Sequence, residues 1–289
     1  MSPGAGGNVV VNLSVLTDQL TPVGVVGNDW RGRCLLESLE SRGVSTYAIL
    51  QKPGYVTNTY CKPMRMGYAG IPVEDPRIDF ENTQPLDPAT EEELVARLLS
   101  AAKNADLLCV SDQFAFGCVG ERVRCTVNAL AEAGLTVVVD SRYRIAEYRH
   151  CILKPNEIEC ARALGYSDDY LREGNVTEDL IRAVAKELSE KTASQLCLTL
   201  GARGSLSFFY GEFTRVNAVP TEPPMDIVGA GDCFLSAFSL ALAAGATIQE
   251  AGVVASLASA VSVKKINTTG SASREEIWAL FDQVGVENE

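Results

Sequence analysis

Short apolar runs alternate with segments of helical periodicity along most of this chain of 289 residues. The runs are rich in Val and Leu and too short for helices, which predicts strands buried on both faces of a sheet. They cover residues 106–110, 135–139, 151–153 and 195–200. Strand, helix and strand repeated in this order predict an α/β fold with a mostly parallel sheet and crossover helices.

Helix starts lie between and after these runs. A Ser, Thr or Asp stands where an N-cap is needed, and in two cases a Glu follows three residues later, which is the spacing of a capping box. The four N-caps predicted in this way are Thr177, Asp87, Thr247 and Ser273. No repeat, linker or low-complexity tract divides the chain, so we expect one domain over residues 1–289.

Residues 52–82 have a different texture. Polar and β-branched residues alternate from Tyr55 to Arg65, and a second extended piece follows from Arg77 to Glu81. This pattern predicts a small antiparallel sheet that is either a lid over a site or an ordinary surface hairpin.

The composition narrows the choice of partner. Twenty-five basic and 37 acidic residues give a net charge of −12 without any basic cluster, which disfavours nucleic acids and anionic membranes as partners. An anionic ligand would therefore need helix N-termini, a metal ion or a few placed cations. One histidine, nine cysteines without a C-x-x-C pair, and no signal peptide or long apolar run argue against a zinc site and predict a cytoplasmic protein.

Polar or glycine-rich segments follow four of the predicted strands. Ligands of open α/β sheets bind beyond the carboxyl ends of the strands, so these segments predict a single site at that edge. The segments begin at Ser111, Asp140, Lys154 and Gly201.

The sharpest local signal is the sequence DIVGAGD from Asp226 to Asp232, which precedes an apolar helical run from Cys233 to Ala244. Small residues at Gly229, Ala230 and Gly231 would let backbone N–H groups approach an anion at a helix start. Asp232 is then either a partner of the helix dipole or a general base that takes a proton from an attacking hydroxyl. The motif by itself leaves both readings open.

This motif resembles the D-T-x-G-A-G-D signature of the ribokinase-like (phosphofructokinase-B) sugar kinases, and further matches follow in the order typical of that family. The resemblance implies a three-layer α/β/α fold with a small β lid. It also implies an ATP- and Mg²⁺-dependent phosphotransferase in which Asp232 is the general base and Gly229–Gly231 form the anion hole.

Other family motifs imply binding roles for residues along the chain. Those for the nucleotide are Thr199, Gly201, Gly204, Ser256, Lys265 and Asn267. Asn156 and Glu159 correspond to an element that binds Mg²⁺ largely through water, and the carbonyls of Asp226 and Val228 to a site for a monovalent cation such as K⁺. The positions implied for the sugar are Asn8, Asn12, Asp112 and Arg142.

Several segments look like the heptose-phosphate kinase branch, which phosphorylates C1 of a heptose 7-phosphate. They are residues 77–81, 111–113 and 140–142. The implied partner is a small sugar or sugar phosphate, and the family resemblance also implies a homodimer that associates through the lid.

The N-terminus departs from the family pattern. Relatives have a first core strand and further lid strands before the glycine turn, whereas this sequence reaches that turn at Pro3–Asn8. We therefore expect the N-terminal strand to be absent, through truncation or true loss. Two function classes follow: a sugar kinase, or a non-catalytic nucleotide- or sugar-binding relative or partner subunit that lacks part of the sugar site.

Overall fold

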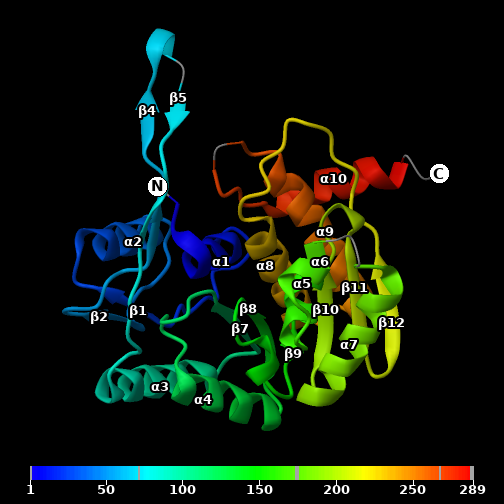
Figure 1. Ribbon diagram of the computed structural model, residues 1–289, viewed down its shortest axis with the longest axis horizontal. Helices are drawn as coiled ribbons and strands as arrows, with labels where there is room; N and C mark the ends of the chain where they lie inside the picture. The colour runs from blue at the N-terminus through cyan, green and yellow to red at the C-terminus, as the bar shows by residue number, and fades with distance from the viewer. Residues whose placement is uncertain (1, 71, 173–175, 267, 287–289) are drawn as a thin grey trace.

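The computed structural model describes residues 2–70, 72–172, 176–266 and 268–286. Its largest sheet has six strands in the order β12-β11-β10-β9-β8-β7 (Figure 1). The parallel part consists of β7 (Leu107–Asp112), β8 (Thr136–Ser141), β9 (Ile152–Leu153) and β10 (Gln195–Thr199). An antiparallel extension adds β11 (Ser205–Phe209) and β12 (Glu212–Val216). The predicted α/β fold with a mostly parallel sheet is confirmed, and the strand boundaries differ from the prediction by one or two residues.

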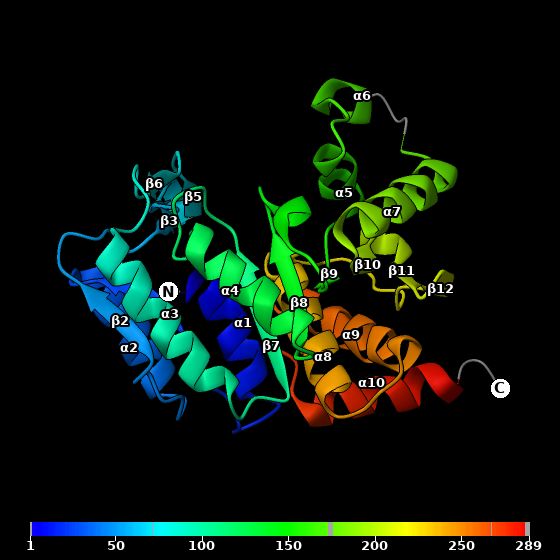
Figure 2. The ribbon, with the colours of Figure 1, turned by 90° about the horizontal axis from the view of Figure 1, so that it is seen from below.

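Helices cover both faces of this sheet, because successive side chains of a strand point to opposite faces. Val137 and Val139 pack into one hydrophobic cluster, and Val138 between them packs into the other. The first cluster is covered by α3 (Pro88–Ala102), α4 (Glu121–Glu132), α5 (Glu157–Ala163) and α7 (Glu178–Thr192). The second is covered by α1 (Gly4–Ser14), α8 (Ala230–Ala243) and α9 (Ile248–Val263). Figure 2 shows α5 and α7 on the opposite side of the strands from α8 and α9.

The remaining helical elements lie at the margins of these layers. They are α2 (Trp30–Glu40), α6 (Asp168–Arg172), α10 (Arg274–Val286) and the 3₁₀ turns η1 (Tyr68–Gly70), η2 (Ile145–Glu147) and η3 (Gly201–Arg203). None of the helices in the described part of the chain is both long and apolar enough to span a bilayer.

The predicted helix caps are confirmed. Thr177 accepts a hydrogen bond from the Leu180 N–H, and Asp87 accepts one from the Thr90 N–H. Thr247 and Ser273 each form a reciprocal pair with the Glu three residues later. Helix α8 begins at Ala230, three residues before the apolar run that predicted it, and this places Asp232 in its first turn.

The sheet is divided near the start of the chain. The strands β1 (Gly24–Gly27) and β2 (Ile49–Lys52) form a separate parallel pair, and β7 is the edge strand of the large sheet. No strand comes before α1 within the residues described. The loop after β7 connects the two sheets, because Cys118 hydrogen-bonds to the backbone of Val25.

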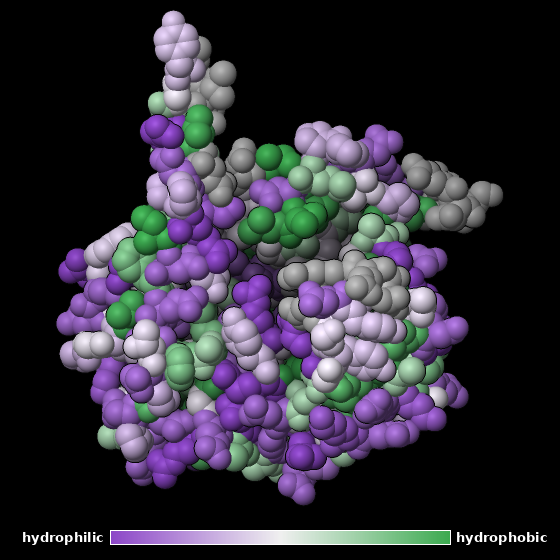
Figure 3. Space-filling model, in the orientation of Figure 1, coloured by the Kyte–Doolittle hydropathy of each residue, from purple (hydrophilic) through white to green (hydrophobic). Residues whose placement is uncertain are grey.

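The segment around residues 59–80 forms the predicted small antiparallel sheet and, in addition, a second antiparallel pair that was not predicted. Strand β3 (Thr59–Cys61) pairs with β6 (Ile78–Phe80), and β4 (Met64–Met66) pairs with β5 (Pro72–Glu74). The second pair projects from the body as an arm (Figure 1). In the space-filling view the arm stands clear of the molecule, and mostly hydrophilic side chains line the hollow beside its base (Figure 3).

Candidate functional site

A cavity of about 200 Å³ lies at the carboxyl ends of the parallel strands. Residues from four strand ends and from the starts of α5 and α8 line it: Gln113, Asp140, Lys154, Asn156, Glu159, Thr199, Gly229, Gly231 and Asp232. The fold therefore brings together the glycine motif, its aspartate and the Asn156–Glu159 element, as the strand-end argument predicts. Asp140 and Lys154 begin two of the polar segments that predicted this site, but neither they nor Gln113 were assigned a binding or catalytic role in it.

Gly229 shapes the glycine cradle at the start of α8. It is the N-cap residue and has the left-handed backbone angle φ = 84°. The Ala230 N–H donates to the Ile227 carbonyl oxygen at 3.2 Å. The N–H groups of Gly231 and Asp232, which lie in the first turn, have no partner inside the helix and are free to bind an anion.

Replacing Gly229 with alanine is expected to destabilise the protein by about 1–3 kcal/mol through backbone strain. A Cβ at Gly229 would also lie 3.2 Å from the Cβ of Thr269, so Thr269 would have to shift by a few tenths of an ångström. Chemical denaturation measures the loss of stability, and we expect the affinity for ATP to fall with it.

Gly231→Ala is the matched control for this variant. Its added Cβ meets no protein atom within 4 Å, and the residue has no left-handed φ. We expect the stability of this control to be unchanged or slightly raised, because alanine favours helix. Equal stability losses in the two variants would contradict the role of the left-handed turn.

Asp232 is held by α1. Its Oδ2 accepts a hydrogen bond of 2.9 Å from Asn8 Nδ2, and Asn8 Oδ1 in turn accepts from Ser2 and Thr269. These donors fix the Asn8 amide with its NH₂ toward Asp232. Burial raises the pKa of Asp232 to about 6, and the nearby Asp140 also raises it, whereas Asn8 and Lys154 lower it. A carboxylate with this pKa is ionised at pH 7 and a better base than an exposed one.

Asn156 and Glu159 bond to each other. The Asn156 side chain accepts from the Glu159 N–H at 2.8 Å, and Glu159 Oε2 accepts from the Asn156 N–H at 2.9 Å. This capping box starts α5 and points the pair at the cavity. Burial raises the pKa of Glu159.

The donor set of the cavity suits a hard cation. Mg²⁺ is typically held by one or two carboxylates together with waters and substrate phosphates. Among the described residues, no group of three or more His, Cys, Asp or Glu side chains is placed to hold a metal by itself. Of the predicted magnesium pair, the Asn156 amide oxygen is engaged in the capping box, whereas the Glu159 carboxylate lines the cavity together with that of Asp140. These two carboxylates could hold a magnesium ion whose other ligands come from water and substrate.

The segment before α8 is folded by its own side chain. The Asp226 carboxylate accepts from the Val228 N–H at 3.0 Å, and the Asp226 N–H donates to the Val263 carbonyl oxygen. These bonds tie the segment that carries the two predicted cation-binding carbonyls to the end of α9.

The residues predicted to bind nucleotide lie on several elements. Thr199 lines the cavity at the end of β10. Gly201 is the first residue of η3 and Gly204 follows this turn, and both have positive φ angles. A Cβ at Gly204 would lie 2.1 Å from the Val216 carbonyl oxygen, so glycine is required there. Asn267 lies outside the described residues.

Ser256 and Lys265 bond to neighbouring segments. The Ser256 hydroxyl, on α9, donates to the Asn217 carbonyl oxygen at 3.3 Å. The Lys265 ammonium bonds to Glu276 at 2.7 Å and to the Ser271 carbonyl oxygen, which ties the end of α9 to α10.

The four residues predicted to bind sugar differ in their surroundings. Asn8 contacts Asp232, and Asn12 donates to the Asn8 carbonyl oxygen while its own Oδ1 is buried without a partner in the described part of the chain. Arg142 is exposed after β8, close enough to Tyr60 and Glu159 to influence their charges. It therefore lies between the base of the lid and the cavity.

Asp112 is enclosed by protein donors. Its side chain is 1% exposed; one oxygen accepts from Arg144 at 2.8 Å, and the other accepts from Ser141 and Tyr148 at 2.8 and 3.0 Å. Arg144 also donates to the carbonyls of Phe114 and Ala115. Asp112 thus joins the loops after β7 and β8.

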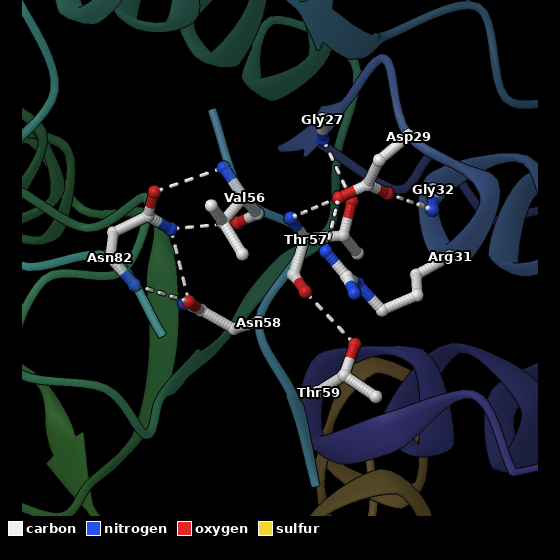
Figure 4. Close-up of polar contacts among 9 residues, drawn as sticks. All are labelled: Gly27, Asp29, Arg31, Gly32, Val56, Thr57, Asn58, Thr59 and Asn82. Carbon is white, nitrogen blue, oxygen red and sulfur yellow. Dashed lines mark hydrogen bonds and ion pairs between the residues drawn. The ribbon is translucent and has the colours of Figure 1, made fainter. Parts of the chain in front are cut away.

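A second network anchors the segment that was predicted as a lid or surface hairpin, residues 52–82 (Figure 4). Asp29 accepts from the N–H groups of Gly32 and Thr57, and the Thr57 hydroxyl accepts from the Gly27 N–H. Burial raises the pKa of Asp29, but the hydrogen bonds from Gly32, Thr57 and Arg31 outweigh it and lower this pKa to about 2. The ionised Asp29 carboxylate therefore fixes Thr57, near the start of the segment 52–82, to the turn between β1 and α2.

Comparison with known proteins gives consistent matches. Residues 2–275 match the family profile described as pfkB family carbohydrate kinase. Curated relatives include the bifunctional protein HldE of Hyphomonas neptunium, 29% identical over 98% of this chain and 56% of that protein, and HldE of Nitratiruptor, 30% identical over 95% of this chain and 55% of that protein. The chain thus spans about half the length of these relatives.

Solved structures share the fold at lower identity. Arabidopsis thaliana ribokinase in complex with ribose and ATP superposes with a TM-score of 0.69 at 19% identity, covering 95% of this chain and 85% of that one. Phosphofructokinase-2 of Escherichia coli in complex with potassium gives a TM-score of 0.70 at 16% identity, covering 97% of this chain and 86% of that one.

Proposed function

This chain belongs to the pfkB family of carbohydrate kinases, and from that premise we propose that it transfers the γ-phosphoryl group of ATP to a hydroxyl of a sugar or sugar phosphate. The observation that carries the proposal is Asp232. It lies beside the glycine cradle, is oriented by Asn8, and has a pKa raised to about 6. If Asp232 only interacted with the helix dipole, its carboxylate would not have to be oriented by Asn8 or to line the cavity.

In the proposed step, the acceptor hydroxyl oxygen forms a bond to the γ-phosphorus while the bond from that phosphorus to the β,γ-bridging oxygen breaks. The hydroxyl proton passes to Asp232, and ADP leaves with the electron pair of the broken bond. The N–H groups of Gly231 and Asp232 stabilise the negative charge of the transferred group. Mg²⁺, held through Glu159 and Asp140, would neutralise phosphate charge.

The acceptor class rests on the resemblance to the heptose-phosphate branch and on the position of Arg142. We propose heptose 7-phosphate, phosphorylated at C1, with the exposed Arg142 guanidinium available to an anionic group of the acceptor. Asn12 supplies a buried amide oxygen that can accept a hydrogen bond from a sugar hydroxyl. Asp112, whose oxygens bond to protein donors, acts by positioning the strand-end loops.

Further parts of the proposal concern the donor and ions. Thr199, Gly201, Gly204, Ser256 and Lys265 would form the nucleotide side of the site, and the carbonyls of Asp226 and Val228 would bind a monovalent cation such as K⁺. A cytoplasmic location stays a prediction.

An ADP-release assay against a panel of sugars and sugar phosphates, including heptose 7-phosphate, tests the function. We expect ATP- and Mg²⁺-dependent turnover with at least one acceptor. Zero turnover across the panel, together with retained ATP binding, would instead support a non-catalytic binding protein.

We also propose that the arm mediates a homodimer. Met64, Met66 and Tyr68 are exposed on it, with Tyr68 fully accessible. Light scattering at assay concentration is expected to give the mass of a dimer, and Met66→Arg is expected to give a monomer of unchanged stability. Tyr47→Arg, at an exposed site outside the arm, is the control, and a monomeric wild-type protein would contradict the proposal.

A further inference from the structure

The catalytic cavity has an unbalanced charge. Three carboxylates line it, those of Asp140, Glu159 and Asp232, whereas Lys154 is the one basic side chain among its described lining residues. A triphosphate would add several negative charges to this space. Among the described lining residues, Lys154 is therefore the one side-chain cation placed to meet a phosphate inside the cavity.

The position of Lys154 is set by the sheet. Parallel pairing of Val139 with Leu153 brings the next two residues, Asp140 and Lys154, side by side at the ends of β8 and β9. The Lys154 N–H donates to the Val139 carbonyl oxygen at 2.8 Å, so the lysine backbone is held by the same ladder. Its ammonium lies 3.0 Å from Asp140 Oδ2, and its side chain is only 3% exposed.

Asp140 does not satisfy the whole ammonium group. An ammonium has three N–H donors, and the described residues offer this one a single partner. A buried ion pair with open donors is a poor source of stability, because desolvation of both charges offsets their attraction. Lys154 lines the cavity, where a bound phosphate can supply the missing acceptors.

We propose that Lys154 binds the phosphoryl group during transfer, with Asp140 orienting its ammonium. This inference rests on the proposed kinase function. Lys154 donates to equatorial oxygens of the transferred group, where charge gathers in the transition state, and acts together with the N–H groups at the start of α8. The contact of Lys154 with the phosphoryl group would be weaker in bound ATP than in the transition state. Removal of Lys154 should therefore lower kcat.

The test is Lys154→Met, which keeps the length and removes the charge. We expect kcat to fall about 100-fold or more, with the KM for the sugar changed by less than about threefold. Lys154→Arg, which keeps the charge but changes the donor geometry, is expected to recover part of kcat. Thermal unfolding of each variant shows whether the fold is kept.

The double variant Asp140→Asn, Lys154→Met separates phosphoryl binding from charge balance. It leaves no uncompensated charge in the pair, so it folds even if Lys154→Met does not. We expect its kcat to lie well below that of Asp140→Asn alone. A Lys154→Met enzyme with kcat within threefold of wild type would overturn the inference. Equal kcat values for the double variant and Asp140→Asn would also overturn it, provided that Asp140→Asn, which loses a proposed magnesium ligand, still shows measurable turnover.

The wild-type protein, assayed in parallel, distinguishes the two proposals. Wild-type turnover with an unaffected Lys154→Met enzyme removes the role of Lys154 alone. Absence of wild-type turnover on every acceptor removes the kinase function and this inference with it.

Discussion

Asp232→Asn is expected to lower kcat by about 10²–10⁴-fold, because the amide cannot take the proton of the attacking hydroxyl. The substitution keeps the shape of the side chain, and its amide oxygen can still accept the hydrogen bond from Asn8. Steady-state kinetics should therefore show a loss in kcat with little change in the KM for ATP.

The pH profile gives a second readout of the same residue. In the wild-type enzyme, kcat/KM is expected to fall below about pH 6, where Asp232 becomes protonated. The residual activity of Asp232→Asn should lack this acid limb. A limb of equal pKa in the variant would assign the titration to another group.

As the pH falls below about 6, the stability of the wild-type protein should rise while its activity falls. The folded-state pKa of Asp232, about 6, lies above the ordinary value of 3.8 for an aspartate, so the folded protein binds the proton more tightly than the unfolded chain. The wild type therefore gains stability from this group as the pH falls from about 6 toward 4, and lacks that gain at pH 7. Asp232→Asn should be as stable as wild type or more stable at pH 7, with a smaller advantage at pH 5.

Denaturation at both pH values measures this difference, and Asp232→Ala extends the test. We expect the alanine variant to fold, because a carboxylate at a helix start contributes little to stability. We expect it to lack phosphoryl transfer, because the proposed base is removed. Unfolding of either variant would show that Asp232 is a structural cap and not the base.

Asp112→Ala is expected to destabilise the protein by about 3 kcal/mol, the largest stability change among the variants considered. The substitution removes the carboxylate that pairs with Arg144 and leaves the hydroxyls of Ser141 and Tyr148 without their acceptor. Removing one partner of a buried charged network leaves the others desolvated, which costs more than the intact network contributes. Urea denaturation at pH 7 measures the change.

Ser111→Ala is the matched control. The Ser111 hydroxyl is buried on the same strand and has no hydrogen-bond partner among the described residues, so its removal should change stability by less than about 1 kcal/mol. If Asp112→Ala were as stable as this control but failed to turn over sugar, Asp112 would contact the substrate directly.

The sequence was sufficient for the parallel strands of the large sheet and for several helices, because these leave local signals, but it did not predict β1, β2, β11 or β12. Apolar runs located β7, β8 and β10, and capping residues such as Thr177 and Thr247 located helix starts. The DIVGAGD motif also located the glycine cradle, since a glycine with φ = 84° before an apolar helix is a local feature.

No local pattern in the sequence predicted the ion pair of Asp140 with Lys154 or the hydrogen bond of Asp29 with Thr57. Asp140 and Lys154 meet only because β8 and β9 pair in one register, and Asp29 reaches Thr57 across 28 positions of chain. Asn8 resembled a sugar-binding residue, yet its amide bonds to Asp232, a contact that depends on how α1 packs on α8. Strand register and helix packing depend on residues far apart in the sequence, so local motifs do not predict these contacts.

The hydrogen bond between Asn8 and Asp232 joins residues 224 positions apart. Joining residues so far apart carries a loop-closure entropy cost that the packing of the intervening elements must offset. During synthesis, Asn8 leaves the ribosome long before Asp232 exists, and the proposed base has no oriented carboxylate until α8 docks on α1. Phosphoryl transfer would therefore be switched on by the completion of folding, and a partly made chain could not consume ATP.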